Sequence, residues 1–150
     1  MQSTMNDKPK RILFLCTGNY YRSRFAEIFF NWQAKQRGLQ WIAESRGLAL
    51  DGSTYGPISR YTVDRLKEQG ITPDEDPRFP LPLSEADLAA ADHIVAVKEA
   101  EHRPLVEARF PGWRDRIEYW HVHDLDCATP DEAMPRLERE LVRLIERLAA

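Results

Sequence analysis

Cysteine is scarce in this sequence, which contains only Cys16 and Cys127 among its 150 residues. Two cysteines are too few for the disulfide framework that stabilises many small exported domains, so we expect the core to hold the fold together. Long apolar runs are also missing, because no stretch approaches the roughly 18 apolar residues that a membrane-spanning helix needs. Residues 1–10 are polar and lack the apolar segment of a signal peptide. We therefore expect a cytoplasmic protein that does not enter membranes.

An excess of basic residues is likewise absent, since 21 lysines and arginines stand against 24 aspartates and glutamates, for a net charge of −3. Nucleic-acid-binding domains usually carry a basic patch, so this charge argues against nucleic acid as a partner. The sequence does have an ordinary hydrophobic fraction, 43%, and enough length for about one domain with a substantial core. We expect residues 1–10 to form a flexible tail and residues 11–150 to form a single domain.

Predicted strands and helices alternate along the chain. Short apolar runs predict strands at residues 11–15, 39–45, 92–97 and 116–122. Amphipathic stretches and helix-start signals predict helices at residues 23–37, 58–69 and 98–109, a short one that opens at Ser84, and a long one that starts at Thr129. This alternation implies a three-layer α/β fold, in which helices flank a four-stranded parallel sheet on both faces.

The most informative stretch joins the first predicted strand to the first predicted helix. It reads Cys-Thr-Gly-Asn-Tyr-Tyr-Arg-Ser from Cys16 to Ser23, so five residues separate Cys16 from Arg22. These five are Thr17, Gly18, Asn19, Tyr20 and Tyr21. In open α/β sheets, ligands bind at the carboxyl ends of strands, and the helix that follows points its free N–H groups and positive dipole end at the loop. The pattern therefore predicts a phosphate-binding loop.

The side chains of this loop suit phosphate chemistry. A helix N-terminus and a nearby arginine favour the thiolate form of a cysteine, which makes Cys16 a candidate nucleophile. Arg22 carries a planar guanidinium that can bind two phosphate oxygens at once. Gly18 permits a tight turn, and Asn19 tolerates a left-handed backbone conformation. Ser23 is expected either to cap the helix or to donate a hydrogen bond to the Cys16 sulfur.

The same string resembles the signature of the low-molecular-weight protein tyrosine phosphatases, Cys-x-Gly-Asn-x-x-Arg-Ser after a hydrophobic strand. Five residues match it position by position: Cys16, Gly18, Asn19, Arg22 and Ser23. The segment Glu44-Ser45-Arg46-Gly47 is similar to a Ser-Ala-Gly stretch on the second strand of the family, and residues 91–97 are similar to its third strand. The resemblance extends over essentially the whole chain, although only the loop is specific.

The resemblance implies a flavodoxin-like strand order and a hydrolase that works through a phosphocysteine intermediate, with no metal and no other cofactor. It implies phosphotyrosine in proteins, or small aryl phosphates, as substrates, and phosphate or vanadate-type anions as ligands of the loop. In this interpretation Cys16 attacks phosphorus, while Arg22 and the loop N–H groups hold the phosphate oxygens. Many members carry a second cysteine in the loop, where this chain has Tyr20 and Tyr21.

A second catalytic group is also needed, because the expelled alcohol or phenol requires a proton from a general acid. The resembling family carries this acid in an Asp-Pro pair after its last strand, and the aligned residue here is Asp124. The proline is missing, since Leu125 follows Asp124, and Asp126 is the alternative acid. The resemblance also places the loop at residues 46–57 in the active-site wall, where Tyr55 is a candidate lining residue.

Three other functions stay open on the sequence. His121 and His123 alternate along the last predicted strand beside Asp124 and Asp126, and such a set can bind zinc or iron in a metallohydrolase. An arsenate reductase on the same scaffold would need two further cysteines for its redox relay, and only Cys127 is present. The missing Asp-Pro pair also allows a phosphate-binding module without turnover. The cysteine-dependent phosphatase ranks first, because a metal site would leave the cysteine loop unexplained.

Overall fold

The structure is a computed structural model that describes residues 8–52, 56–125 and 128–150. Three residues singled out from the sequence, Tyr55, Asp126 and Cys127, lie outside these ranges. Among the described residues, no helix has both the length and the apolar character to cross a membrane.

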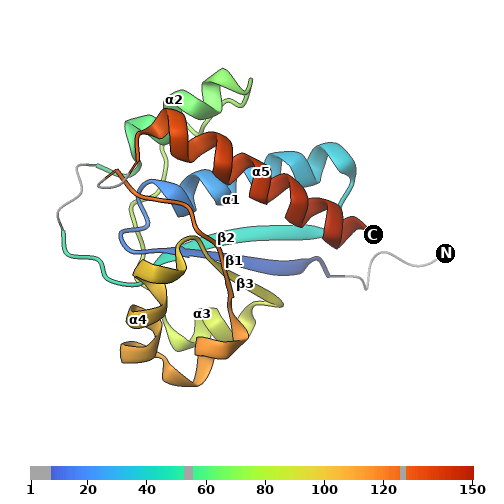
Figure 1. Ribbon diagram of the computed structural model, residues 1–150. Coiled ribbons are helices and arrows are strands. Elements are labelled where there is room, and N and C mark those ends of the chain that lie inside the picture. Colours follow the sequence, from blue (N-terminus) through green and yellow to red (C-terminus); the bar gives the residue numbers. More distant parts are fainter. Residues whose placement is uncertain (1–7, 53–55, 126–127) are drawn as a thin grey trace.

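A parallel sheet with strand order β2-β1-β3-β4 forms the middle layer (Figure 1). Its strands are β1 (Lys10–Cys16), β2 (Trp41–Gly47), β3 (His93–Ala96) and β4 (Glu118–Tyr119). The order confirms the predicted four-stranded parallel sheet. It also puts β1 inside the sheet, paired with β2 on one side and β3 on the other, so the loop after Cys16 starts from the middle of the carboxyl edge.

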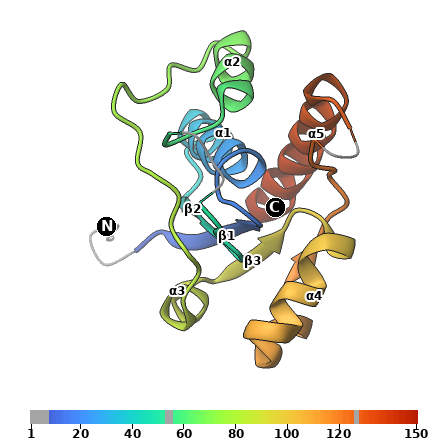
Figure 2. The same ribbon diagram turned by 90° about the vertical axis from the view of Figure 1, so that its left-hand side faces the viewer.

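Helices cover both faces of the sheet, as the alternation of elements predicted. The helices α1 (Arg22–Arg37), α2 (Arg60–Glu68) and α5 (Pro130–Ala149) lie on one side. On the other side lie α3 (Glu85–Ala90) and α4 (Glu99–Arg109) (Figures 1 and 2). These two helix layers give the three-layer α/β fold.

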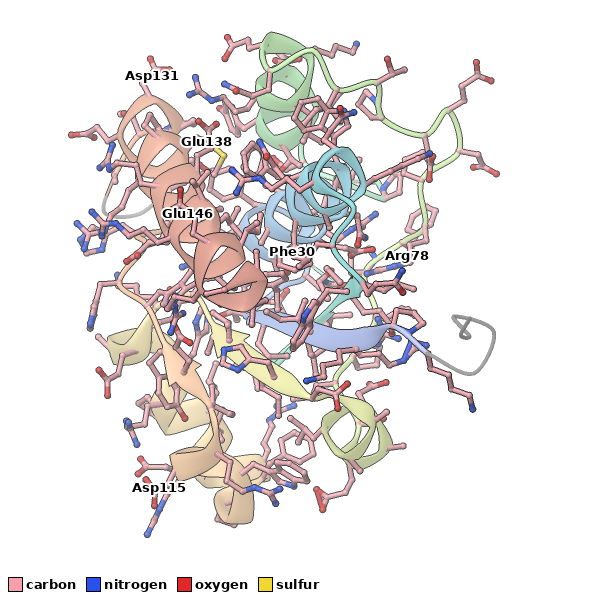
Figure 3. All side chains as sticks on the ribbon, turned by 90° about the vertical axis from the view of Figure 1, so that its right-hand side faces the viewer. Phe30, Arg78, Asp115, Asp131, Glu138 and Glu146 are labelled. Carbon is pink, nitrogen blue, oxygen red and sulfur yellow. The ribbon has the colours of Figure 1, made fainter. Side chains whose placement is uncertain are left out.

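Strand β1 is buried on both faces, which explains why its sequence is an unbroken apolar run rather than an alternating one. Phe14 and Cys16 belong to the core cluster shared with α1 and α5, whereas Leu13 and Leu15 belong to the cluster shared with α3 and α4. Phe30 lies between α1 and the sheet in Figure 3, and its ring centroid is 5.8 Å from that of Phe14. Cys16 thus ends a strand whose last five residues are all buried.

The helix ends follow the signals in the sequence. Thr129 and Glu132 form a reciprocal capping box at the start of α5, and the Thr129 N–H donates to Glu132 Oε1 at 2.9 Å. Ser84 and Asp87 form the same arrangement at the start of α3. Gly38 ends α1 in the left-handed conformation, with φ 66°. These ends agree with the predicted helix starts at Ser84 and Thr129 and with the predicted end of the first helix at residue 37.

The last strand is shorter than the predicted range 116–122. Arg116 belongs to a 3₁₀ helix, η2 (Pro111–Arg116), so pairing in β4 begins only at Glu118. Beyond β4 the backbone stays bonded to the β3 side, because the Trp120 N–H donates to the carbonyl of Ala96 and the Val122 N–H donates to that of Val97. These bonds lead the chain toward the loop after β1.

Glu118 joins β4 to α5, and its replacement by glutamine is expected to destabilise the fold. The hydrogen bond between Glu118 and His93, at 2.8 Å, is the largest cause that lowers the pKa of Glu118. Burial would raise this pKa, but hydrogen bonds from Trp120 and Arg147 also lower it, and the pKa is about 2. A lowered carboxyl pKa stabilises the folded state above the ordinary value of 4.5 and loses that contribution as the pH falls toward about 2. In urea unfolding, the free energy of unfolding of Glu118→Gln should be about 2 kcal/mol lower than that of the wild type at pH 7. At pH 3 the difference should be about half as large.

Glu146 offers a matched control, because it is an exposed glutamate on α5, next to Arg147 in the sequence. The variant Glu146→Gln should unfold at the urea concentration of the wild type. Equal free energies of unfolding for the wild type and Glu118→Gln at pH 7 would contradict the contribution assigned to Glu118.

Candidate active site

The segment between Cys16 and Arg22 forms a loop that is tied to the chain after β2. The Leu48 N–H donates to the Cys16 carbonyl at 2.9 Å, and the Ala49 N–H donates to the Thr17 carbonyl at 3.0 Å. These two bonds use carbonyl oxygens of the loop and leave its N–H groups for other acceptors. The loop therefore has the polarity that an anion-binding site requires.

Gly47, the last residue of β2, allows the close approach of these two segments. A Cβ atom on Gly47 would lie 2.9 Å from the Thr17 carbonyl oxygen and 2.2 Å from Leu50 Cδ1. A side chain at this position would push the loop away, which gives a physical reason for glycine at the end of the Glu44-Ser45-Arg46-Gly47 segment.

Asn19 holds the loop in shape. Its φ of 52° lies in the left-handed region, as the sequence predicted. The side-chain amide donates to Ser23 Oγ and Ser45 Oγ, both at 2.9 Å. Its Oδ1 atom accepts from Arg78 Nη1 and from the Leu81 N–H, both at 3.0 Å. Every hydrogen-bonding position of this buried amide is thus used, and together they tie the loop to α1, to β2 and to the proline-rich segment at residues 71–83.

Ser23 contacts the sulfur rather than capping the helix. Its Oγ lies 2.9 Å from Cys16 Sγ, and the Asn19 N–H donates to the same sulfur at 3.3 Å. Because Ser23 Oγ accepts a hydrogen bond from the Asn19 amide, its own proton can be directed to the sulfur. The helix begins at Arg22 with Tyr21 in the cap position, and no side chain caps it. Of the two roles expected for Ser23, the structure shows the contact with the Cys16 sulfur and not the helix cap.

Arg78 is a site residue that the sequence reasoning missed. It belongs to the proline-rich segment at residues 71–83 and lies near β2 in Figure 3. Its Nη2 atom donates to Ser45 Oγ at 3.0 Å and to Glu27 Oε1 at 3.1 Å, while Ser45 Oγ donates to Glu27 at 2.5 Å. This network fixes the groups that hold Asn19. No local pattern distinguishes Arg78 from an ordinary surface arginine.

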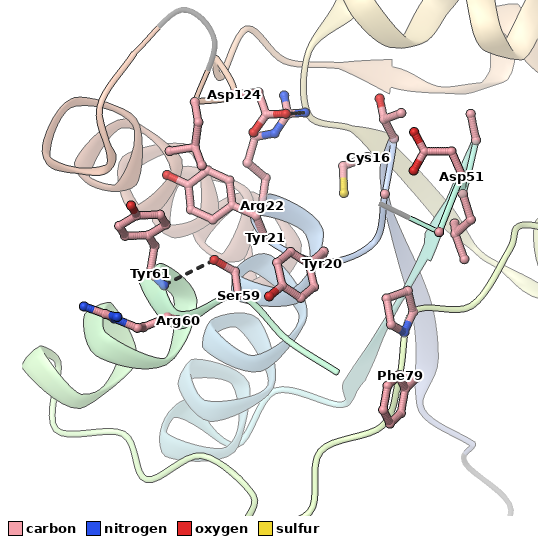
Figure 4. Close-up of a pocket in the computed structure, with 17 residues that line it drawn as sticks. Cys16, Tyr20, Tyr21, Arg22, Asp51, Ser59, Arg60, Tyr61, Phe79 and Asp124 are labelled. Atoms are coloured by element: carbon pink, nitrogen blue, oxygen red, sulfur yellow. Dashed lines mark hydrogen bonds and ion pairs between the residues drawn. The ribbon is translucent and has the colours of Figure 1, made fainter. Parts of the chain in front are cut away.

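Arg22 is buried at the edge of the loop, with 2% of its side chain exposed. Its Nη1 donates to the Val122 carbonyl at 2.9 Å, and its Nη2 donates to Glu101 Oε2 at 2.8 Å. Asp124 Oδ2 lies 3.5 Å from the same Nη2 (Figure 4). Burial would lower the pKa of Arg22, but negative charge at Cys16, Glu101 and Asp124 outweighs burial and raises it. The guanidinium therefore stays charged.

Glu101 and His102, in the first turn of α4, were also missed. Glu101 Oε2 accepts hydrogen bonds from Arg22 and from the Thr17 hydroxyl. Burial would raise the pKa of Glu101, but His102, Arg22 and Thr17 outweigh it and hold the pKa well below its usual range. The rule that ligands meet the carboxyl ends of strands could have pointed to these residues, because α4 directly follows β3.

The loop forms the floor of a pocket of about 710 Å³. Side chains from five segments line it, including Tyr20, Tyr21, Tyr61, Phe79 and Asp124 (Figure 4). Burial and the nearby Asp124 carboxylate raise the pKa of Tyr21 to about 12, so its hydroxyl stays neutral at physiological pH. The structure thus brings Cys16, Arg22 and Asp124 into one pocket, and their catalytic roles stay predictions.

His121 and His123, the two histidines considered as metal ligands, are both exposed. In the parts of the chain that the structure describes, no group of three or more histidine, cysteine, aspartate or glutamate side chains is placed to hold a metal ion.

Residues 11–148 match the family described as Low molecular weight phosphotyrosine protein phosphatase. The chain belongs to this family. The match includes β1, the cysteine loop and the segment that carries Asp124, so the resemblance seen in the loop extends over the fold.

Relatives within the family differ in the phosphorylated residue that their names give. Over 106 residues, the chain is 30% identical to a protein-arginine-phosphatase of Bacillus subtilis, a match that covers 71% of this chain and 67% of the relative. It is also 30% identical over 149 residues to a protein-arginine-phosphatase of Geobacillus stearothermophilus, covering 94% and 95%. A low molecular weight protein tyrosine phosphatase from T. tengcongensis has 29% identity and a TM-score of 0.77, covering 92% of this chain and 99% of that one.

Proposed function

We propose that this family member is a cysteine-dependent phosphatase that removes phosphate from proteins, with phosphotyrosine as its preferred substrate. The observation that carries the proposal is the environment of Cys16 Sγ at the floor of the pocket, where the Asn19 N–H donates to it at 3.3 Å and Ser23 Oγ lies 2.9 Å away. A thiolate at this position would be a nucleophile next to the guanidinium proposed to bind phosphate.

In the first step, the Cys16 thiolate attacks phosphorus, so that a sulfur–phosphorus bond forms and the bond from phosphorus to the leaving oxygen breaks. Arg22 and the loop N–H groups stabilise the negative charge on the phosphate oxygens during this transfer. Asp124 in its protonated form gives its proton to the leaving oxygen. Its position 3.5 Å from Arg22 Nη2 supports this role, since it places the carboxyl group beside the phosphate-binding guanidinium.

In the second step, the Asp124 carboxylate takes a proton from a water molecule, and the water oxygen attacks phosphorus. The sulfur–phosphorus bond breaks, inorganic phosphate forms, and Cys16 returns to the thiolate. The cycle needs no oxidant, reductant or metal ion, because one carboxyl group gives a proton in the first step and regains one in the second.

Phosphotyrosine is the preferred substrate in this proposal because four aromatic side chains contribute to the pocket lining. Tyr20 and Tyr21 rise from the loop, and Tyr61 and Phe79 line the pocket farther from the sulfur (Figure 4). Aromatic rings attract each other in stacked and edge-to-face arrangements. A phenyl phosphate that points its phosphate at Cys16 would pass between these rings.

Phosphoarginine is the second candidate substrate. The two protein-arginine-phosphatases at 30% identity favour it, as does the presence of two carboxylates, Asp51 and Asp124, in the pocket lining. A guanidinium group carries positive charge, which such carboxylates attract, and its flat face also stacks on aromatic rings.

A pair of matched peptides distinguishes the two candidates. One peptide sequence would be prepared with phosphotyrosine and with phosphoarginine at the same position, and phosphate release would be measured with EDTA present. We expect a kcat/KM at least about tenfold higher for the phosphotyrosine peptide, because the pocket favours the aromatic leaving group. The opposite ranking would assign the protein to phosphoarginine. Binding of phosphate or vanadate without turnover of either peptide would indicate a binding module.

A further inference from the structure

Glu101 brings a negative charge to the site proposed to hold a phosphate dianion. Its Oε2 atom lies 2.8 Å from Arg22 Nη2 and accepts a hydrogen bond from the Thr17 hydroxyl. A carboxylate in this position competes with phosphate for one of the cation's donors and repels the anion. The chain nevertheless directs it there through several specific contacts.

The first turn of α4 holds Glu101 in place. The buried His102 accepts a hydrogen bond at Nδ1 from the Lys98 N–H at 3.0 Å, so the proton of the neutral imidazole is on Nε2. That Nε2 atom lies 3.1 Å from Glu101 Oε2. One carboxylate oxygen thus accepts hydrogen bonds from Arg22 and Thr17 and lies close to His102, and only 25% of the Glu101 side chain is exposed.

Two hydrogen bonds hold the ends of the Arg22 guanidinium. The Val122 carbonyl accepts from Nη1, and the Glu101 carboxylate accepts from Nη2. Asp124 is farther away, at 3.5 Å, and 41% of its side chain is exposed. In the proposed reaction Asp124 must also be free to reach the leaving oxygen. Glu101 is therefore the group best placed to keep Arg22 still while Asp124 acts.

We propose that Glu101 is a positioning residue that fixes the Arg22 guanidinium and the Thr17 hydroxyl in the phosphate site and whose charge weakens the binding of the released phosphate. The inference rests on the proposed function, since it concerns the same site. It assigns two separable effects to one side chain: hydrogen bonding, which a glutamine also provides, and negative charge, which a glutamine lacks.

Two substitutions separate these effects. Glu101→Gln keeps an oxygen that can accept from Arg22 and Thr17 but removes the charge, whereas Glu101→Ala removes both. Glu99→Gln is the matched control, because Glu99 lies in the same helical turn and pairs at 2.8 Å with Arg103 instead. For each variant, kcat and KM for an aryl phosphate and the inhibition constant of inorganic phosphate would be measured, with thermal unfolding as a check of folding.

For Glu101→Gln, we expect an inhibition constant for phosphate about 5- to 20-fold lower than in the wild type, with kcat changed by less than about threefold. For Glu101→Ala, we expect kcat to fall at least about tenfold, because Arg22 and Thr17 lose a shared anchor. Glu99→Gln should match the wild type in every measurement.

The proposal is overturned if Glu101→Gln binds phosphate no more tightly than the wild type. It is also overturned if the alanine and glutamine variants lose kcat and thermal stability to the same extent, which would make the role of Glu101 purely structural. Absence of turnover in the wild type would instead refute the proposed function. Calorimetric titration with inorganic phosphate would still measure the effect of the Glu101 charge in that case.

Discussion

Replacing Cys16 by serine is expected to abolish hydrolysis of aryl phosphates, with kcat reduced at least about 10⁴-fold. A serine hydroxyl is far less ionised than a thiol at neutral pH, so the attacking group is lost while the loop backbone and Arg22 remain. Steady-state hydrolysis in the presence of EDTA measures the loss. Calorimetric titration should still detect inorganic phosphate binding, because the loop N–H groups and the guanidinium are unchanged.

The other cysteine provides the control for this experiment. Cys127→Ser should keep the kcat of the wild type, since the proposed reaction uses one thiol. Wild-type activity in Cys16→Ser would refute the thiolate mechanism. Loss of hydrolysis in Cys127→Ser would contradict a reaction that uses the Cys16 thiol alone.

Replacing Asp124 by alanine is expected to lower kcat by about 10²- to 10⁴-fold on a phosphotyrosine peptide, because the leaving phenolate no longer receives a proton. The loss should be smaller on an aryl phosphate whose phenol is more acidic, since such a leaving group departs without full protonation. A comparison of kcat across aryl phosphates of graded phenol acidity, for the wild type and Asp124→Ala, measures this dependence.

Two further variants complete the test of the acid. Asp115→Ala is the matched control, because Asp115 lies exposed on η2 and forms ion pairs with Arg103 and Arg114 at the surface. Its kcat should equal that of the wild type. Activity that survives in Asp124→Ala but disappears in Asp126→Ala would move the acid to Asp126. This result would remove Asp124 from the mechanism without affecting the assignment of Cys16.

The fold was predictable because its signals are local. The unbroken apolar run of β1, the capping box at Thr129 and the stop at Gly38 each depend on residues close together in sequence. The weakest boundary was the last strand, where residues near 116 have strand-like composition but form η2 instead. The strand β4 contains only two residues, so its start depends on how the surrounding segments pack and not on a local sequence pattern.

Within the site, the order of residues from Cys16 to Ser23 was enough to predict a loop between strand and helix with a left-handed asparagine, and phosphate binding by this loop stays a prediction. Local spacing determines this part, since one strand end, one turn and one helix start bring all the groups together. Asp124 was proposed from resemblance, and the structure puts it 3.5 Å from Arg22. Its role as the acid stays a prediction.

What the sequence by itself determined about this protein is therefore the α/β fold, the phosphatase family and the loop around Cys16. Only the tertiary structure decided what surrounds that loop. Arg78 reaches Asn19 across 59 positions of sequence, and Glu101 reaches Arg22 across 79. No local pattern marks Arg78, and only its position just after β3 points to Glu101. Each residue is brought to the loop by its own segment, Arg78 by the proline-rich stretch and Glu101 by the helix that follows β3. Contacts between such distant segments are set by the packing of whole elements against the sheet, which no short motif records.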